Sequence, residues 1–332
     1  MRKAILTVIV SMLMINLAAA SSIQSLDQLE QEKGEQYIPP PQHNNSSNNS
    51  IPEFVSPERF EMVASSSGDY LYEMEISDAG NIFVAGTTSG STLAASGCYD
   101  TNASGSPYYS LYIAKLDKNG TCIWLTVVDA QMTGYFLTGS SDWRTLSGIA
   151  IDSNENVYIS TRFDSTAPRD LNFGNISVNV EDAGILAKIS SNGSWSWVRI
   201  ISSHGYSDLE IDSFGNIWHS YYLNLGTNNI NSKVAKYNSS GDLQFTRVLP
   251  QSSGATFVQE MAHDNFGYLY LSGSFSGSLS CISNYSTGAG QVYTAQQVYD
   301  PFIMKMDQQG NCLWMEKGSS ESNAYVGSMA VD

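Results

Sequence analysis

The stretch Ile151-Asp-Ser-Asn-Glu-Asn156-Val-Tyr-Ile-Ser160 decides the fold, because variants of it return along the chain. In each copy, two runs of apolar, β-branched or aromatic residues flank a turn rich in Asp, Asn and Gly, which predicts a β-hairpin. The turn residues of this first motif include Asp152, Asn156, Asp212, Asn216 and Asp264. The other copies read Ile76-Ser-Asp-Ala-Gly-Asn81-Ile-Phe-Val-Ala85, Ile211-Asp-Ser-Phe-Gly-Asn216-Ile-Trp-His-Ser220 and Ala262-His-Asp264-Asn-Phe-Gly-Tyr268-Leu-Tyr-Leu-Ser272.

A second motif follows each copy at a variable distance and predicts another hairpin. It has a lysine, then a glycine five residues later that suits a turn position with positive φ, and an aromatic residue four residues further on, in the outgoing strand. The lysines are Lys115, Lys188, Lys236 and Lys305, the glycines Gly120, Gly193, Gly241 and Gly310, and the aromatic residues Trp124, Trp197, Phe245 and Trp314. Two hairpins per repeat give four antiparallel strands.

Uneven repeat spacing favours a β-propeller over a tight solenoid, whose stacked coils tolerate little variation in length. A four-stranded sheet that is apolar on both faces packs between two neighbours, as propeller blades do. We expect an all-β fold of four blades, over about 70–130, 146–203, 206–250 and 258–320. Residues 325–332 start the motif again, which predicts the first strand of a fifth blade and a natural protein that continues beyond Asp332. The strand expected at 60–64 is an outer strand whose partners come from the C-terminal end.

The repeats resemble a known family. The run Ile-Asp-x-x-Gly-Asn-x-Tyr/Trp, followed by Ala-Lys-x-x-x-x-Gly-x-x-x-Trp, is similar to the SBBP-type β-propeller repeat of secreted prokaryotic proteins. The resemblance covers about residues 60–332 and implies a nominally seven-bladed propeller with no shared catalytic residues. This sequence departs from the pattern at Tyr268, at Glu155 and at Phe245.

The N-terminus predicts export. Residues 1–20 combine Arg2 and Lys3, an apolar run and three alanines, which is the pattern of a cleavable signal peptide; an uncleaved membrane anchor is the alternative. Residues 21–56 are polar and predict a disordered linker before the partial propeller at 57–332. We expect a secreted or cell-surface protein with no membrane span in the mature chain. The net charge of -16 argues against nucleic-acid partners.

The four cysteines recur at matching places in the first and fourth repeats. Cys122 and Cys312 each lie two residues after the turn glycine, whereas Cys98 and Cys281 each follow a Ser-Gly-rich stretch after the second strand. This recurrence predicts Cys98–Cys122 and Cys281–Cys312 disulfides in an exported protein. The alternative is a four-cysteine metal site, which lacks C-x-x-C spacing.

No residue is predicted to be catalytic, cofactor-binding or metal-binding. The recurring lysines are expected to be structural, with a buried stem and an ammonium group paired at the strand end. The tryptophans are expected to pack between blades, with a sugar-stacking platform as the alternative. Calcium is an alternative role for the Asp and Asn turns, although the same residues form ordinary turns.

The connectors between second and third strands predict where binding occurs. They cover about residues 91–108, 165–183, 224–231 and 277–299, differ in length and lie on one face of the predicted propeller. The leading hypothesis is a non-catalytic extracellular binding protein with a protein or glycan partner on this loop face. The alternatives are a propeller enzyme (a lyase, a glycan-acting hydrolase or a quinone-dependent dehydrogenase) and a structural surface-layer or stalk component. An enzyme should bring acidic or basic residues of different blades together at the centre.

Overall fold

The computed structural model describes residues 62–64, 70–89, 93–95, 97–100, 110–128, 134–137, 148–201, 208–224, 230–281, 291–296, 298–318, 326 and 328–331. All lie in the compact unit Ser56–Asp332. The predicted signal peptide at 1–20 and most of the linker at 21–56 belong to the other unit and lie outside the described residues. The described residues form strands and turns without any helix, and so without a helical stretch able to cross a membrane.

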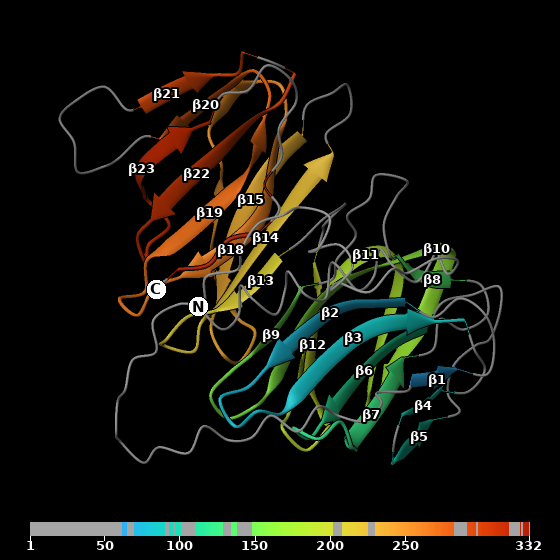
Figure 1. The fold of residues 1–332 in the computed structure, drawn as a ribbon. Helices are drawn as coiled ribbons and strands as arrows, with labels where there is room; N and C mark the ends of the chain where they lie inside the picture. Colours follow the sequence, from blue (N-terminus) through green and yellow to red (C-terminus); the bar gives the residue numbers. More distant parts are fainter. Residues whose placement is uncertain are drawn as a thin grey trace, which may run out of the picture. The chain divides into compact units, whose positions relative to one another are not determined.

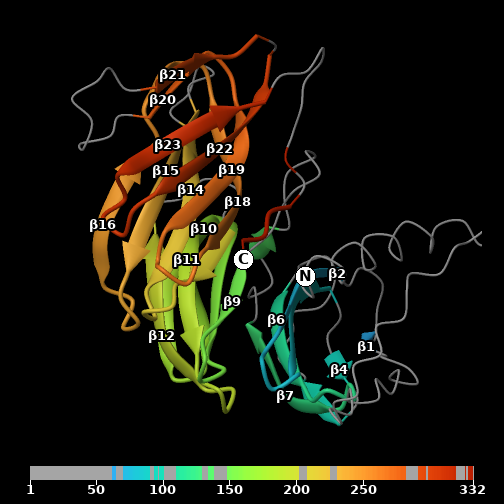
Figure 2. The same cartoon turned by 60° about the vertical axis from the view of Figure 1, so that its left-hand side comes forward.

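Four antiparallel sheets contain most of the described residues, and three of them have four strands whereas one has five (Figure 1). In each sheet, consecutive strands are hydrogen-bonded neighbours, as shown for sheet IV in Figure 2. Sheet I consists of β2 (Tyr70–Ile76), β3 (Ile82–Thr88), β6 (Ser110–Leu116) and β7 (Cys122–Val128). Sheet II consists of β9 (Ile149–Ile151), β10 (Val157–Phe173), β11 (Ile176–Ile189) and β12 (Trp195–Ile201). Sheet III consists of β13 (Asp208–Ile211), β14 (Ile217–Asn224), β15 (Ile230–Tyr237) and β16 (Leu243–Val248). Sheet IV consists of β18 (Thr256–His263), β19 (Leu269–Phe275), β22 (Asp300–Met306) and β23 (Cys312–Lys317).

The connectors between second and third strands add further β-structure. In sheet II, β10 and β11 continue as a long hairpin, and β8 (Gly134–Leu137) pairs with β10. In sheets I and IV, a strand from outside the connector joins the connector hairpin, which gives two three-stranded sheets. They are β1 (Met62–Ala64), β4 (Leu93–Ala95) and β5 (Cys98–Asp100), and β17 (Gln251–Ser253), β20 (Ser278–Cys281) and β21 (Gln291–Thr294).

One prediction for the ends of the repeat region needs correction. The strand expected to join C-terminal partners, β1, pairs instead with β4, because the connector hairpin offers it an unpaired edge nearby. At 325–332, the described residues 326 and 328–331 are not assigned to a strand. A ladder requires a neighbouring strand, and no second strand of a fifth sheet pairs with them among the described residues.

One turn geometry recurs at eight places, after every first strand and every third strand. In the turn after β9, Asp152 N–H donates to the carbonyl of Asn156 at 3.0 Å, and Glu155 N–H donates to that of Asp152 at 2.8 Å. The fourth turn residue has positive φ; it is glycine in seven turns and Glu155 in the eighth. The four glycines of the second motif thus adopt the conformation that the sequence predicts.

Apolar side chains of consecutive sheets pack against each other. We call the face that carries Phe83, Tyr158, Trp218 and Tyr270 the rear face of its sheet. Phe83 and Ile113 of sheet I pack with Val157 and Ile159 of sheet II. Similar clusters join the rear face of sheet II to sheet III and that of sheet III to sheet IV. The first strands of neighbouring sheets also contact one another. This arrangement is compatible with propeller blades, but the described residues do not form a closed propeller.

Candidate functional site

Three of the recurring lysines pair with the recurring aspartates of their own sheets. The distances from Nζ to Oδ2 are 3.9 Å for Lys188 and Asp152, 3.4 Å for Lys236 and Asp212, and 3.6 Å for Lys305 and Asp264. Each ammonium group also lies over an aromatic ring of the second strand, 4.8 Å from the centroid of Tyr158, 4.6 Å from that of Trp218 and 4.7 Å from that of Tyr270. Each of these ammonium groups therefore lies between an aspartate carboxylate and an aromatic ring.

The aspartates also organise their turns. Asp212 Oδ1 accepts hydrogen bonds from the backbone N–H groups of Phe214 and Asn216, and its Oδ2 accepts from Trp218 Nε1 at 3.0 Å. Burial alone would raise the pKa of Asp212, but these hydrogen bonds, that of the Asn216 side chain and the Lys236 charge lower it. Within the described residues, no three His, Cys, Asp or Glu side chains form a group able to hold a metal ion. Calcium binding stays an alternative role of the turns.

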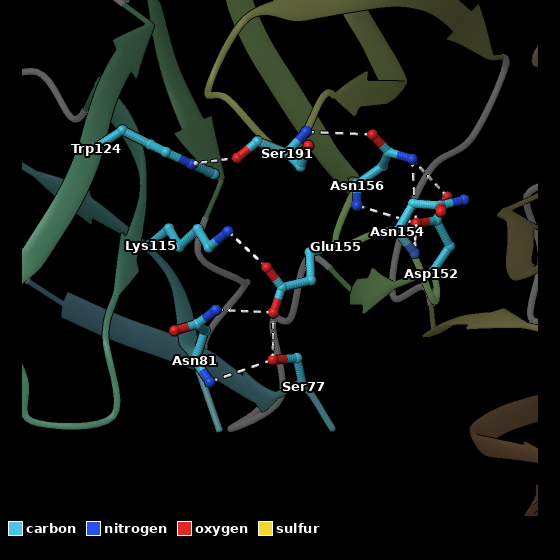
Figure 3. Close-up of polar contacts among 9 residues, drawn as sticks. All are labelled: Ser77, Asn81, Lys115, Trp124, Asp152, Asn154, Glu155, Asn156 and Ser191. Carbon is cyan, nitrogen blue, oxygen red and sulfur yellow. Dashed lines mark hydrogen bonds and ion pairs between the residues drawn. The ribbon is translucent and has the colours of Figure 1, made fainter. Parts of the chain in front are cut away.

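Sheet I departs from this pattern and obtains its carboxylate from sheet II. Ser77 occupies the aspartate position, so Lys115 Nζ donates to Glu155 Oε2 at 2.7 Å (Figure 3). The other carboxylate oxygen, Oε1, accepts from Ser77 Oγ at 2.6 Å and from Asn81 Nδ2 at 2.8 Å. Hydrogen bonds from Lys115 and Ser77 lower the pKa of Glu155 to about 2. Glu155 therefore links the two sheets as a carboxylate.

The tryptophans of the fourth strands contact the turn of the following sheet. Trp124 Nε1 donates to the carbonyl of Ser191 at 3.1 Å, and Trp197 Nε1 donates to that of Ser239 at 3.2 Å. A Cβ atom added at Gly193 would lie 2.9 Å from Trp124, and one at Gly241 would lie 3.0 Å from Trp197. Trp314, in the last sheet, contacts only Tyr270 of its own sheet among the described aromatic residues. Trp124 and Trp197 thus lie between sheets.

Both predicted cysteine pairs are disulfides in the structure. Cys98 joins Cys122, and Cys281 joins Cys312. Each bond ties a connector strand, β5 or β20, to the start of the fourth strand of its sheet. In sheet II the same position holds Trp195, whose ring packs edge to face on Phe173 of the long hairpin, at 4.8 Å between centroids. The three connectors are thus anchored at one equivalent position.

A group of carboxyls on the first strands is the main feature that the repeat motifs did not predict. Glu73 and Glu75 lie on β2, Asp208 on β13 and Glu260 on β18, so three sheets contribute. Asp208 accepts hydrogen bonds from the backbone N–H of Leu209 at 2.8 Å and from that of Met261, in sheet IV, at 2.5 Å. Burial first, and then the charges of the neighbouring carboxylates, raise the pKa of Glu73 and that of Asp208 to about 8.

The chemistry of these carboxyls depends on which of them are protonated and which are ionised. Glu73 and Asp208 hold protons near neutral pH and can donate them, whereas an ionised carboxylate beside them attracts cations. The sequence gives only a faint signal, Glu-Met-Glu-Ile76 and Asp-Leu-Glu-Ile211 just before the turn motif. Sheet II has Gly-Ile-Ala-Ile151 there, so the carboxyls are not part of the repeat.

No protein-family model matches the chain, and no curated protein matches it significantly.

Proposed function

We propose that this chain is a secreted or cell-surface β-propeller protein of the SBBP repeat type that binds a protein or glycan partner through its connectors. The observation that carries the proposal is the contrast between the two ends of the sheets. The turns at one end share a single geometry, whereas the connectors at the other end differ. A constant scaffold with variable loops is typical of binding proteins.

Anchored connectors support binding further. The disulfides of Cys122 and Cys312 and the contact of Trp195 with Phe173 hold three connectors in defined positions. Loops that are fixed before they bind lose less conformational entropy on binding, which raises affinity. Two disulfides also fit an oxidising compartment outside the cell.

The experiment replaces the long hairpin of sheet II at 165–182 with an Asn-Gly turn. The unaltered chain is screened against immobilised glycans and purified surface proteins, and each ligand found is measured with the variant. We expect affinity to fall at least tenfold while circular dichroism keeps the β signal. The matched control is Asn154→Ala in an exposed turn at the other end, which should bind normally. Equal binding by the hairpin variant and the unaltered chain, for every ligand found, would overturn this connector's role.

A glycan-acting hydrolase is the second candidate, favoured by the carboxyls from three sheets. Such enzymes use one protonated and one ionised carboxyl, and the raised pKa values of Glu73 and Asp208 suit the acid. Hydrolysis of a polysaccharide panel by the unaltered chain, lost in both Glu73→Gln and Asp208→Asn, would favour this candidate. Its absence across the panel would leave binding as the function.

A further inference from the structure

An exposed phenylalanine lies at the turn end of sheet IV. Phe266 belongs to the turn after β18, and its side chain is 76% exposed. Phe214 has the same position in sheet III and is 63% exposed, although sheet IV follows it. Its ring lies beside Gly267 of sheet IV, since a Cβ added there would be 2.7 Å from it. A following sheet therefore leaves this position mostly open, so the exposure of Phe266 does not depend on whether a further sheet covers sheet IV.

The two turns of sheet IV enclose an open hollow of about 270 Å³. Small-molecule sites have volumes of about 300–1,000 Å³, so this one suits a ligand of one or two rings. In sheet III, the residues equivalent to three of the lining residues are Ser239, Ser240 and Gln244, and all three are exposed. A following sheet thus leaves the rest of this region open as well. The lining consists of Phe266, Tyr268, Asp307, Gln308, Gln309 and Leu313.

Tyr268 departs from the turn pattern in a way that does not serve the turn. At the same position of sheet III, Asn216 Nδ2 donates to Asp212 Oδ2 at 2.9 Å. Tyr268 keeps the backbone hydrogen bond to Asp264, at 2.9 Å, but its side chain makes no hydrogen bond within the described part of the chain. The exchange removes a hydrogen bond from the turn and adds an aromatic ring to the hollow.

Contacts within sheet IV position the side chains that line the hollow. Lys305 Nζ lies 4.1 Å from the centroid of the Tyr268 ring, which orients that ring. Gln308 Nε2 donates to the carbonyl of Phe266 at 3.1 Å, and this bond leaves the side-chain oxygen of Gln308 for a ligand. Gln309 is exposed, and its side-chain amide has no hydrogen-bond partner among the described residues. Amides both donate and accept hydrogen bonds, as the hydroxyl groups of a sugar do.

The charges around the hollow favour a neutral ligand. The chain has a net charge of -16, which repels anionic sugars. Asp307 is the one carboxylate of the lining, and its own turn engages both of its oxygens. Oδ1 accepts from the backbone N–H groups of Gln309 and Asn311 at 2.9 and 2.8 Å, and Oδ2 accepts from Asn311 Nδ2 at 2.9 Å. A cationic ligand would therefore not find a free carboxylate in this lining.

We propose that the hollow at the turn end of sheet IV binds a neutral glycan. The C–H face of a pyranose ring packs on Phe266, beside the ring of Tyr268, and the sugar hydroxyls bond to the side-chain amides of Gln308 and Gln309. The hollow lies at the opposite end of the sheet from the connectors. The proposal therefore does not depend on the partner that the connectors bind.

The probes are four neutral disaccharides, namely cellobiose, lactose, mannobiose and chitobiose. Binding to the full chain is detected by saturation-transfer NMR and measured by isothermal titration calorimetry, and we expect at least one disaccharide to bind with a millimolar Kd. Tyr268→Asn introduces the residue of the other sheets, so it should fold with an unchanged or higher melting temperature and bind at least tenfold more weakly. Phe266→Ala, at an exposed site, should weaken binding to a similar extent. The matched control is Asn154→Ala, at the same position of sheet II, which should bind normally.

The variant that lacks the long hairpin of sheet II separates this site from the connectors. A disaccharide bound in the hollow should bind equally to that variant and to the unaltered chain. Binding that is lost in the hairpin variant but kept in Tyr268→Asn and Phe266→Ala would place the sugar on the connectors and overturn the proposal. The absence of binding for all four disaccharides at high millimolar concentration would overturn it as well.

Discussion

Glu155 combines an unfavourable backbone conformation with a contact between sheets. Its φ of 60° lies in the left-handed region, where the equivalent turns have Gly80, Gly215 and Gly267. That conformation costs a residue with a side chain about 1–2 kcal/mol. Lys115 is 7% exposed, and removing the partner of a buried charge costs about 3–5 kcal/mol. The ion pair therefore outweighs the strain, and the pair Ser77 and Glu155 replaces the usual pair of aspartate and glycine.

The contribution of Glu155 is tested by moving the carboxylate that pairs with Lys115 from position 155 to position 77, in sheet I. Glu155→Gly should relieve the backbone strain but leave Lys115 unpaired, with a net loss of about 2–3 kcal/mol in the free energy of unfolding. The double variant Ser77→Asp/Glu155→Gly restores the arrangement of the other sheets and should recover most of that loss. Urea denaturation measures both. If the double variant is no more stable than Glu155→Gly, Lys115 does not need a carboxylate.

At the scale of the element, the turn after the third strand of sheets II, III and IV is also a contact between sheets. Gly193 has a φ of 86°, and its Cα faces the ring of Trp124. A side chain at this position meets backbone strain and a clash together. Gly215 has a similar φ of 79° but no neighbouring atom within 4 Å of an added Cβ. The two glycines separate the cost of conformation from the cost of packing.

Gly215→Ala should therefore cost about 1–2 kcal/mol, from conformation alone. Gly193→Ala should cost about 1–3 kcal/mol more, because Trp124 must move and its hydrogen bond to Ser191 is lost. Chemical denaturation of the two variants gives the difference directly. Equal losses would mean that the Trp124 ring adapts freely.

The anchor position two residues after the turn glycine explains the uneven use of disulfides. It holds cysteine in sheets I and IV, Trp195 in sheet II and Leu243 in sheet III. Leu243 is 56% exposed, and the described strands of sheet III add no extra sheet to their connector. A covalent or aromatic anchor thus occurs where a connector folds back along its sheet.

Replacing Cys281 and Cys312 by alanine should reduce the free energy of unfolding by about 4 kcal/mol in the chain-entropy model, since the bond closes a loop with a sequence separation of 31. The connector should also become sensitive to protease while the rest of sheet IV stays resistant. Limited proteolysis with mass spectrometry checks this. Cleavage throughout the chain would show that the disulfide supports the whole sheet and not the connector alone.

For the whole molecule, the sequence predicted the structural features that recur in each repeat and missed the contacts that occur at one place only. The hairpins, the positive φ of Gly193 and the pairing of Lys188 at a strand end follow from local pattern, because each depends on residues within one repeat. Glu155 looked like a mere departure from the motif, since its partners belong to another sheet. Glu73 and Asp208 were missed because their effect on each other depends on how whole sheets pack.

Buried titratable groups make the stability of the molecule depend on pH in two directions. His219 is fully buried, and burial lowers its pKa from 6.5 to about 3. Below pH 6.5 the unfolded chain binds a proton that the folded chain rejects, so stability falls on acidification toward pH 3 by about 1.4 kcal/mol per pH unit. In His219→Gln, melting temperature should depend less on pH between 6.5 and 4. An unchanged slope would show that other groups control this range.

Glu73 and Asp208 act in the opposite direction, because their pKa values are raised, from 4.5 and 3.8, to about 8. The folded chain keeps protons that the unfolded chain releases above about pH 4, so their contribution to stability is present at low pH and is lost as pH rises to 8. Glu73→Gln and Asp208→Asn remove this loss, because an amide remains neutral. Each variant should melt at a higher temperature than the unaltered chain at pH 9, and the advantage should shrink toward pH 4. Melting curves from pH 4 to pH 9 measure this effect. A difference in melting temperature between variant and unaltered chain that does not change with pH would mean that the carboxyls are ionised in the fold and that a bound cation or water stabilises them.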